Sequence, residues 1–258
     1  MITSPQNPQI KHIQRLQNKS RDRKIEQAFV VEGVRLGEEA LQYGWTPEIV
    51  LYAENLDERG LQVVNQFQAQ GVSVNQVTLE VMQAASDTET PQGLLMVLPL
   101  KGQPQPQKLD FVLIPDAVRD PGNLGTLFRT ALAAGVDLVI LPPGTVDPLS
   151  PKVVRAAMGA HFRLPIVKTS WNEIKEMVKP LRVFVAEAKK GISYTKADLR
   201  YPLALVIGNE ACGPGQEAQQ LANDWLHIPM PGEVESLNAA IAGSVLMFEV
   251  VRQRTEIK

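Results

Sequence analysis

The feature that most constrains the fold is a series of continuous apolar segments that begins at residue 110 and alternates with helical patterns. Segments that are apolar at every position are typical of strands buried on both faces, which occur in parallel sheets covered by helices. Helical spacing of apolar residues marks 123–135 and 236–254 between or after them. The four strand segments are "DFVLIPD" (110–116), "VDLVILP" (136–142), "RVFVAEA" (182–188) and "LALVIGN" (203–209). The sequence therefore predicts an α/β domain with a mostly parallel sheet.

The first half alternates as well, in shorter pieces. Strands are predicted at 28–33, 48–53 and 93–99, with helices at 34–44 and 58–71 that each end at a glycine. This pattern predicts a small α/β sandwich. A Pro- and Gln-rich stretch without hydrophobic period follows and is typical of a linker. We therefore expect domains at 1–98 and 110–258, joined by a linker at 99–109 and able to fold separately.

Charge and cysteine content exclude several classes of protein. A net charge of −2 excludes a globally basic nucleic-acid binder, although it leaves room for a local basic patch. One cysteine, Cys212, excludes an internal disulfide framework. No apolar run has membrane-spanning length, and the polar N-terminal stretch has no apolar signal core. We expect a cytoplasmic protein with no membrane contact.

A local basic patch is present in "KHIQRLQNKSRDRK" (11–24). This segment contains six cations and a single acid, Asp22, and such an excess of positive charge suits a surface that binds phosphates. A solvated helix face is the alternative. The candidate RNA-binding residues are Lys11, Arg15, Lys19, Arg21, Arg23 and Lys24.

Three polar, glycine-bearing loops follow apolar strands, at 116–129, 207–215 and 228–238. Ligands of parallel sheets bind outside the carboxyl ends of the strands, so these loops are expected to share a cleft. Taken singly, each residue has a simpler explanation: the glycines permit turns, and Asn123 caps a helix. Ser236 and Asn238, at the start of the closing helix, could likewise be caps only. Polar groups of similar type at three strand ends favour a shared site.

Other chemistries fit the sequence poorly. It has neither the G-x-G-x-x-G that follows a strand in dinucleotide sites nor the Lys-Ser/Thr of a phosphate-binding P-loop. It also lacks the G-x-S-x-G of serine hydrolases. The histidines, His12, His161 and His227, are scattered without metal-ligand spacing, so no metal is expected.

The three loops together resemble the motifs of the SpoU (TrmH-type) RNA ribose 2′-O-methyltransferases of the SPOUT superfamily. The motif segments are "RDPGNLGTLFRTALAAG", "LVIGNEACGPG" and "IPMPGEVESLNAAIAGSVLMFEV", in that order. The first half is similar to the ribosomal-protein-like substrate-binding domain of this family, through "ITSPQNPQIK", "FVVEGVRLGEEAL" and "DTETPQGLL".

This resemblance implies a C-terminal α/β domain with a deep trefoil knot, which general topology rules disfavour. It also implies a homodimer formed through that domain, with residues of both subunits near the site. S-adenosylmethionine (SAM) would lie in the knot, in contact with Gly208, Ile228, Met230, Leu237 and Asn238. The candidate catalytic residues are Arg129, Asn123, Glu210, Ser236 and Asn238.

The implied reaction is methylation of a ribose hydroxyl in ribosomal or transfer RNA, with ribosomal RNA favoured by the added N-terminal domain. Arg129 would activate the hydroxyl, either as a base or as a cation that stabilises negative charge on oxygen or binds a phosphate. The base role is demanding because a guanidinium hardly loses its proton. An alternative from another class is a non-catalytic RNA-binding module that retains the fold.

Overall fold

The computed structural model describes residues 1–232 and 234–255, which form two compact units. Unit 1 comprises Met1–Lys101 together with Asp147–Phe162. Unit 2 comprises Gly102–Val146 and the described residues from Arg163 onward. The chain therefore crosses between the units at three places, after residues 101, 146 and 162.

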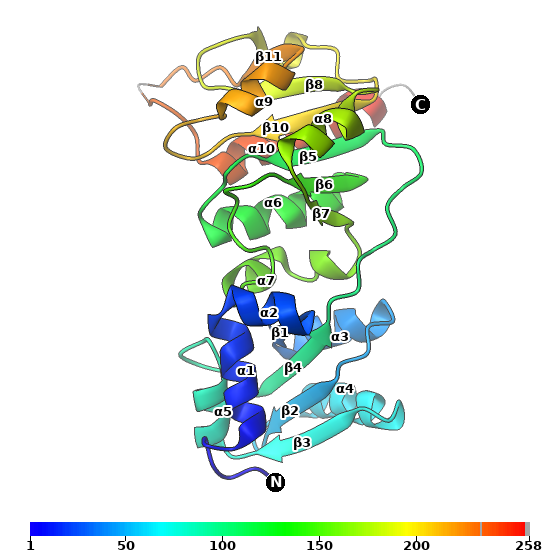
Figure 1. The fold of residues 1–258 in the computed structure, drawn as a ribbon, viewed down its shortest axis with the longest axis vertical. Coiled ribbons are helices and arrows are strands. Elements are labelled where there is room, and N and C mark those ends of the chain that lie inside the picture. The colour runs from blue at the N-terminus through cyan, green and yellow to red at the C-terminus, as the bar shows by residue number, and fades with distance from the viewer. Residues whose placement is uncertain (233, 256–258) are drawn as a thin grey trace. The chain divides into compact units, whose positions relative to one another are not determined.

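Unit 2 contains a seven-stranded sheet in the order β7-β6-β5-β10-β8-β11-β9 (Figure 1). Every neighbouring pair is parallel, as the continuous apolar segments predict. Because all strands run the same way, their carboxyl ends meet at one edge. The strands are β5 (Phe111–Pro115), β6 (Leu138–Leu141), β7 (Ile166–Lys168), β8 (Arg182–Ala186), β9 (Ile192–Ser193), β10 (Leu203–Ile207) and β11 (Asp224–His227).

Helices cover both faces of this sheet. On one face α8 (Trp171–Val178) and α9 (Gln216–Leu221) pack on alternate residues of β5, β6, β8 and β10. On the other, α6 (Pro121–Ala133) and α10 (Ala239–Thr255) lie side by side. The approach of α10 is close: a Cβ on Gly243 would come within 2.5 Å of a Leu127 methyl. A short 3-10 helix, η2 (Tyr194–Lys196), follows β9.

Unit 1 contains a mixed four-stranded sheet in the order β1-β4-β2-β3, in which only β2 and β3 are parallel. One face packs on α1 and α5, and the other on α3 and α4. The strands are β1 (Ala28–Glu32), β2 (Ile49–Ala53), β3 (Ser73–Val77) and β4 (Leu94–Pro99). The helices are α1 (Pro8–Asn18), α2 (Ser20–Glu26), α3 (Val34–Gln42), α4 (Glu58–Ala69) and α5 (Leu79–Ala85).

The segment 147–162 completes the core of unit 1, although it follows β6 of unit 2 in the chain. It forms α7 (Pro151–Ala157) and a 3-10 helix, η1 (Ala160–Phe162). Val154 and Phe162 are buried beside Phe29, and the Trp45 indole donates a 3.1 Å hydrogen bond to the Phe162 carbonyl. Separate folding of the two halves stays a prediction, and unit 1 needs this segment to close its core.

His161 and Asp147 show how polar groups of this segment are accommodated. Burial lowers the pKa of His161 to about 4, so the ring stays neutral near pH 7, with Nε2 2.7 Å from the Pro148 carbonyl. Burial by itself raises the pKa of Asp147. Hydrogen bonds from Arg23 and Ser20 outweigh that effect, so the pKa of Asp147 lies below its ordinary value.

Arg23 is the partner that makes burial of Asp147 possible. The guanidinium is 3% exposed and donates to the Asp147 carboxylate at 3.0 and 2.5 Å. It also donates to the carbonyls of Leu16 and Gln17, at 2.5 and 2.8 Å. A guanidinium occupied in this way has no free face for phosphate. Arg23 is therefore not a candidate RNA-binding residue. The remaining candidates are the exposed cations Lys11, Arg15, Lys19, Arg21 and Lys24.

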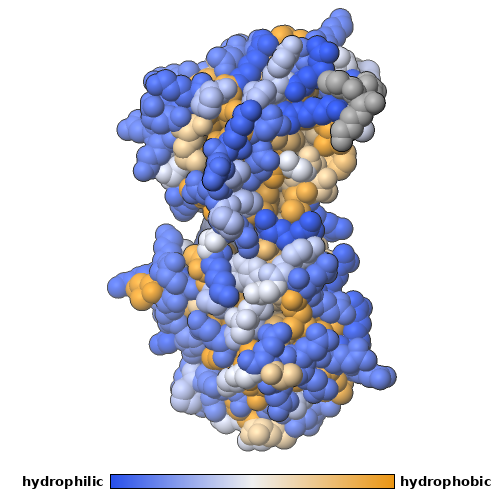
Figure 2. Space-filling view, turned by 90° about the vertical axis from the view of Figure 1, so that its right-hand side faces the viewer, coloured by the Kyte–Doolittle hydropathy of each residue, from blue (hydrophilic) through white to orange (hydrophobic). Residues whose placement is uncertain are grey.

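Several predicted strands and helices are confirmed, including β1, β2, β4, α3, α4 and the strands β5, β6, β8 and β10. No helix among the described residues is long and apolar enough to cross a membrane. On the face shown in Figure 2, hydrophilic residues predominate and hydrophobic residues are exposed in small patches. The trefoil knot stays a prediction, because strand order alone does not establish how the chain is threaded.

Replacement of Arg23 should destabilise unit 1 far more than replacement of its exposed neighbour. We expect Arg23→Ala to lower the free energy of unfolding by about 2–4 kcal/mol, because the half-buried Asp147 would lose its arginine partner and the space of the guanidinium would be emptied. Arg21→Ala, the matched control, should change it by less than about 0.5 kcal/mol. Urea unfolding followed by circular dichroism measures both. Equal stability of the two variants would contradict the structural role of Arg23.

Candidate functional site

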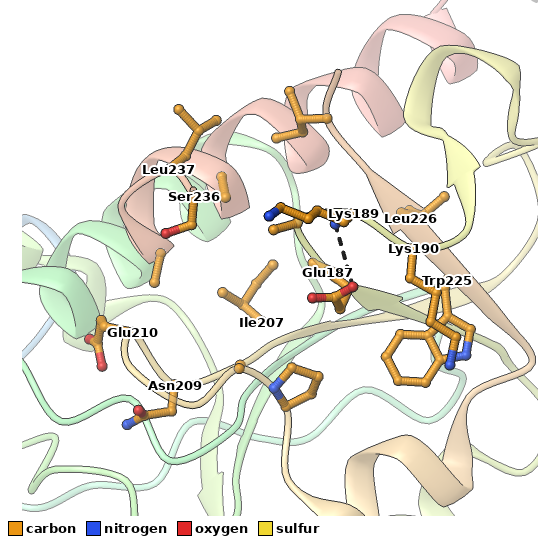
Figure 3. A pocket seen from close by; sticks show the side chains of 18 of the residues that line it. Glu187, Lys189, Lys190, Ile207, Asn209, Glu210, Trp225, Leu226, Ser236 and Leu237 are labelled. Carbon is orange, nitrogen blue, oxygen red and sulfur yellow. Dashed lines mark hydrogen bonds between the residues drawn. The ribbon is translucent and has the colours of Figure 1, made fainter. Parts of the chain in front are cut away.

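A cavity of about 640 Å³ opens in unit 2 at the carboxyl ends of β8, β10 and β11 (Figure 3). Its walls come from the loops that follow these strands and from the start of α10. The volume lies within the range of about 300–1,000 Å³ that is usual for small-molecule sites. The predicted sharing of a cleft is thus confirmed for the loops at 207–215 and 228–238, which both line this cavity. It is wrong for the loop at 116–129, which contributes none of the described residues that line it.

The loop after β5 ends in a helix cap that the sequence did not identify. Asp120 accepts a 2.8 Å hydrogen bond from the backbone N–H of Asn123, and Pro121 occupies the first helical position. Asn123 therefore lies within the first turn of α6 and is not its cap. Its side chain remains available for contacts with the other loops.

The loop after β10 is folded tightly around Asn209. The Asn209 side chain accepts from the backbone N–H groups of Ala211 and Cys212, at 2.9 and 3.1 Å, and donates to the Ala117 carbonyl at 2.7 Å. Ala117 itself has a φ of 51°, a left-handed conformation that is unfavourable for a residue with a Cβ. A Cβ on Gly208 would come within 2.3 Å of the Pro214 nitrogen. Glycine is therefore required where this loop starts.

Asn123 joins the three loops through its side-chain amide. Its nitrogen donates to the Glu210 carboxylate at 3.0 Å, and its oxygen accepts from the Asn238 amide at 2.9 Å. Glu210 lies 3.4 Å from the backbone nitrogens of Arg119 and Asp120, and both bonds are long. Three candidate residues from three separate loops thus form one polar chain, which we call the amide chain.

Asn238 has a second role at the start of α10. Its side-chain oxygen accepts from the backbone N–H groups of Ala240 and Ile241, at 2.9 and 3.2 Å. The capping interpretation and the site interpretation of Asn238 are therefore both correct, because its oxygen caps the helix while its nitrogen joins the amide chain. Ser236 lies two residues earlier and lines the cavity.

The other predicted residues fall into two groups. Gly208, Glu210, Ile228, Met230, Ser236 and Leu237 line the cavity. Arg129 does not line it: this residue is exposed on α6, about 9 Å along the helix axis from Asn123 and on a different side. Within one chain the structure brings Asn123, Glu210 and Asn238 together but leaves Arg129 apart from the cavity.

Sequence reasoning missed several residues that shape the site. Asp116, which is 3% exposed, accepts a 2.6 Å hydrogen bond from the Gly215 N–H and so braces the loop after β10 against β5. Burial raises the pKa of this carboxyl. The loop after β8 was missed entirely, although Lys189 and Lys190 line the cavity. A polar residue at each strand end was the available signal, as it was for the other loops. No cluster of metal-ligating side chains occurs in the part of the chain that the structure describes.

The chain belongs to the SpoU rRNA methylase family, whose sequence profile matches residues 110–248. Residues 7–96 match a second profile, the MRM3-like substrate binding domain. The chain is 32% identical to the 23S rRNA (guanosine(2553)-2′-O)-methyltransferase RlmP of Bacillus subtilis, over 96% of this chain and 98% of that protein. It is also 32% identical to the human mitochondrial rRNA methyltransferase 3, over 87% of this chain and 67% of that protein.

Solved structures resemble the whole chain. An rRNA methyltransferase from Sinorhizobium meliloti with bound AdoMet (SAM) is 32% identical, with a TM-score of 0.87 over 97% of each chain. The AviRb methyltransferase of Streptomyces viridochromogenes in complex with AdoMet is 26% identical, with a TM-score of 0.86 over 97% of this chain and all of that one. The resemblance in sequence that suggested the SpoU family is therefore confirmed.

Two substitutions of Asn238 should separate its roles. Asn238→Asp keeps an oxygen that caps α10 but loses the nitrogen that donates to Asn123, so its thermal stability should stay near that of the wild type. Asn238→Ala loses both and should be about 1 kcal/mol less stable. Methylation of RNA should fall about tenfold or more in both variants, because both break the amide chain. Normal turnover by the Asp variant would show that capping is the only role of Asn238.

Proposed function

We propose that this chain is a SAM-dependent RNA methyltransferase that modifies the 2′-hydroxyl of a ribose, and that its substrate is ribosomal RNA. The observation that carries this proposal is the amide chain beside a cavity of nucleoside size, in a member of the SpoU family. RlmP, which the chain matches over nearly its full length, is named as a 23S rRNA 2′-O-methyltransferase. The intact amide chain favours an enzyme over a non-catalytic RNA-binding module.

The residues around the cavity fit a nucleoside cofactor. Apolar side chains of Ile207, Leu226 and Leu246 offer a surface for a purine, while Asn209 and Glu210 add polar groups at one end. Gly208, Ile228, Met230 and Leu237 would hold SAM, largely through their backbone groups, and Asn238 would support them through the cap of α10. When bound, SAM supplies an electrophilic methyl group carried on a sulfonium.

Arg129 would stabilise the negative charge that develops on the ribose oxygen as its proton leaves. A guanidinium keeps its proton at all ordinary pH values, so the cationic role is physically easier than that of a base. The guanidinium of Arg129 forms no hydrogen bond or ion pair with the described residues, which leaves its side-chain donors available to a substrate. The amide chain would meanwhile hold the loops in place around the acceptor.

We further propose that a second copy of the chain brings its Arg129 to the cavity. Two apolar residues on α10, Ile241 and Phe248, are 52% and 49% exposed, and they lie seven residues apart on one side of the helix. Another side of α10 packs on α6, which carries Arg129, through Gly243 and Ser244. A dimer through α6 and α10 would bury these side chains and move two Arg129 residues toward two cavities.

Mixed dimers test both the function and the position of Arg129. Wild-type protein should transfer radiolabelled methyl groups from SAM to ribosomal RNA, and Arg129→Ala and Asn238→Ala should each lose that activity. When the two variants are co-expressed, about a quarter of all sites should regain activity, because half of the dimers are mixed and one site in each has both residues intact. An inactive wild type would overturn the function. Inactive mixed dimers would place Arg129 in the cavity of its own chain.

We propose that unit 1 binds the RNA through the exposed cations of α1 and α2. Lys11, Arg15, Lys19, Arg21 and Lys24 are all exposed, and Glu26 is paired with Arg15 at 3.7 Å. The MRM3-like substrate binding profile covers these helices. The cytoplasmic location stays a prediction, since the relatives include a bacterial enzyme and mitochondrial ones.

The salt dependence of RNA affinity tests this surface. Neutralising Lys19, Arg21 and Lys24 by Gln should weaken binding and reduce the slope of log affinity against log salt by up to about 2–3, because fewer counterions are released. The matched control neutralises Lys168, Lys175 and Lys179, which are exposed cations of unit 2. Filter binding between roughly 50 and 300 mM salt measures both. Equal slopes for the two triple variants would show that Lys19, Arg21 and Lys24 do not contribute to RNA binding.

A further inference from the structure

Lys189 is a cation whose ammonium lies within the cavity. It follows β8, and Figure 3 shows its side chain extending across the cavity toward Ser236, away from Lys190 and Trp225. Its backbone N–H donates a 3.4 Å hydrogen bond to Glu187, but no hydrogen bond or ion pair joins its ammonium to the described residues. The structure thus aims an available positive charge at the side of the cavity where Ser236 lies.

The other described charged residues that line the cavity are Lys190, Glu187, Glu210 and Glu235. Lys190, the other cation among the described lining residues, lies with its ammonium 3.9 Å from the centre of the Trp225 ring, a cation–π contact. Glu210 accepts from Asn123 in the amide chain. Lys189 therefore differs from Lys190 in having no partner for its charge within the chain that the structure describes.

We propose that Lys189 is the anion-binding residue of the cavity and pairs with the carboxylate of the methionine moiety of SAM; this inference rests on the proposed function. SAM carries a sulfonium and an ammonium, both cationic, and its carboxylate is the one anionic group. An ammonium in the same cavity repels both of these cations. Pairing with the carboxylate is the arrangement in which Lys189 favours the ligand.

Pairing with Lys189 would also affect which ligands the cavity prefers. A ligand that has the nucleoside but lacks the amino acid can fill the apolar part of the cavity and gains nothing from Lys189. A ligand with the full methionine tail fills the apolar part of the cavity and also reaches Lys189. Lys189 would thus select cofactors with an amino-acid tail over truncated nucleosides, while contributing no group to the transfer itself.

Calorimetry with two ligands tests this role without RNA or turnover. S-adenosylhomocysteine has the carboxylate, whereas 5′-methylthioadenosine keeps the nucleoside and sulfur but lacks the amino acid. Lys189→Ala should weaken binding of S-adenosylhomocysteine about five- to tenfold, as expected for a partly exposed ion pair, and leave methylthioadenosine unchanged. Lys189→Arg should bind both ligands within about twofold of the wild type. Lys190→Ala, the matched control, should not change the ratio of the two affinities.

The outcomes that overturn the proposal are distinct. Equal weakening of both ligands by Lys189→Ala would make Lys189 part of the cavity wall only. Unchanged affinities, with a loss of RNA affinity and a smaller salt slope, would assign Lys189 to an RNA phosphate. Failure of the wild type to bind S-adenosylhomocysteine or SAM would instead overturn the proposed function. Because Lys189 is exposed, its variants should unfold at the same temperature as the wild type.

Discussion

The hydrogen bonds of a single side-chain amide, that of Asn123, hold the candidate site together. One end binds Glu210 from the loop after β10, and the other binds Asn238 at the start of α10. An amide suits this position because it offers a donor and an acceptor at once, whereas a carboxylate would repel Glu210. The network is possible because all strands of the sheet are parallel, so that their following loops meet at one edge.

Unit 1 depends on a segment that the chain supplies from the middle of unit 2. Residues 147–162 bring Val154 and Phe162 into its core and give Arg23 its carboxylate partner. Any division of the protein at the linker would separate the buried Arg23 from the half-buried Asp147 and break their ion pair. The two units are therefore joined by three crossings of the chain, of which the Pro- and Gln-rich linker is only one.

The residues that line the cavity come partly from the family motifs and partly from segments outside them. The family motifs contribute Ile207 and Leu246 to its apolar wall, together with the glycine that lets the loop after β10 turn closely, whereas Leu226 lies outside them. Its cations come from Lys189 and Lys190, which lie outside those motifs. The first is aimed into the cavity and the second rests on Trp225, so two adjacent lysines of equal charge have different surroundings. The family motifs and the cavity's two cations therefore lie in different loops.

The sequence by itself determined the parallel sheet, the main strands and helices, and the motifs that identify the family, because continuous apolar segments and glycine-bearing loops are local patterns. It also singled out Asn123, Glu210 and Asn238. Only the tertiary structure decided that Asp120, not Asn123, caps α6, and that Arg23 is buried against Asp147. It likewise decided that residues 147–162 belong to unit 1. The Asp120 cap is a local bond over three positions that Asn123 obscured, since both residue types can cap a helix. The other two outcomes depend on contacts between residues far apart in the chain, 124 positions for Arg23 and Asp147, and no local pattern encodes them.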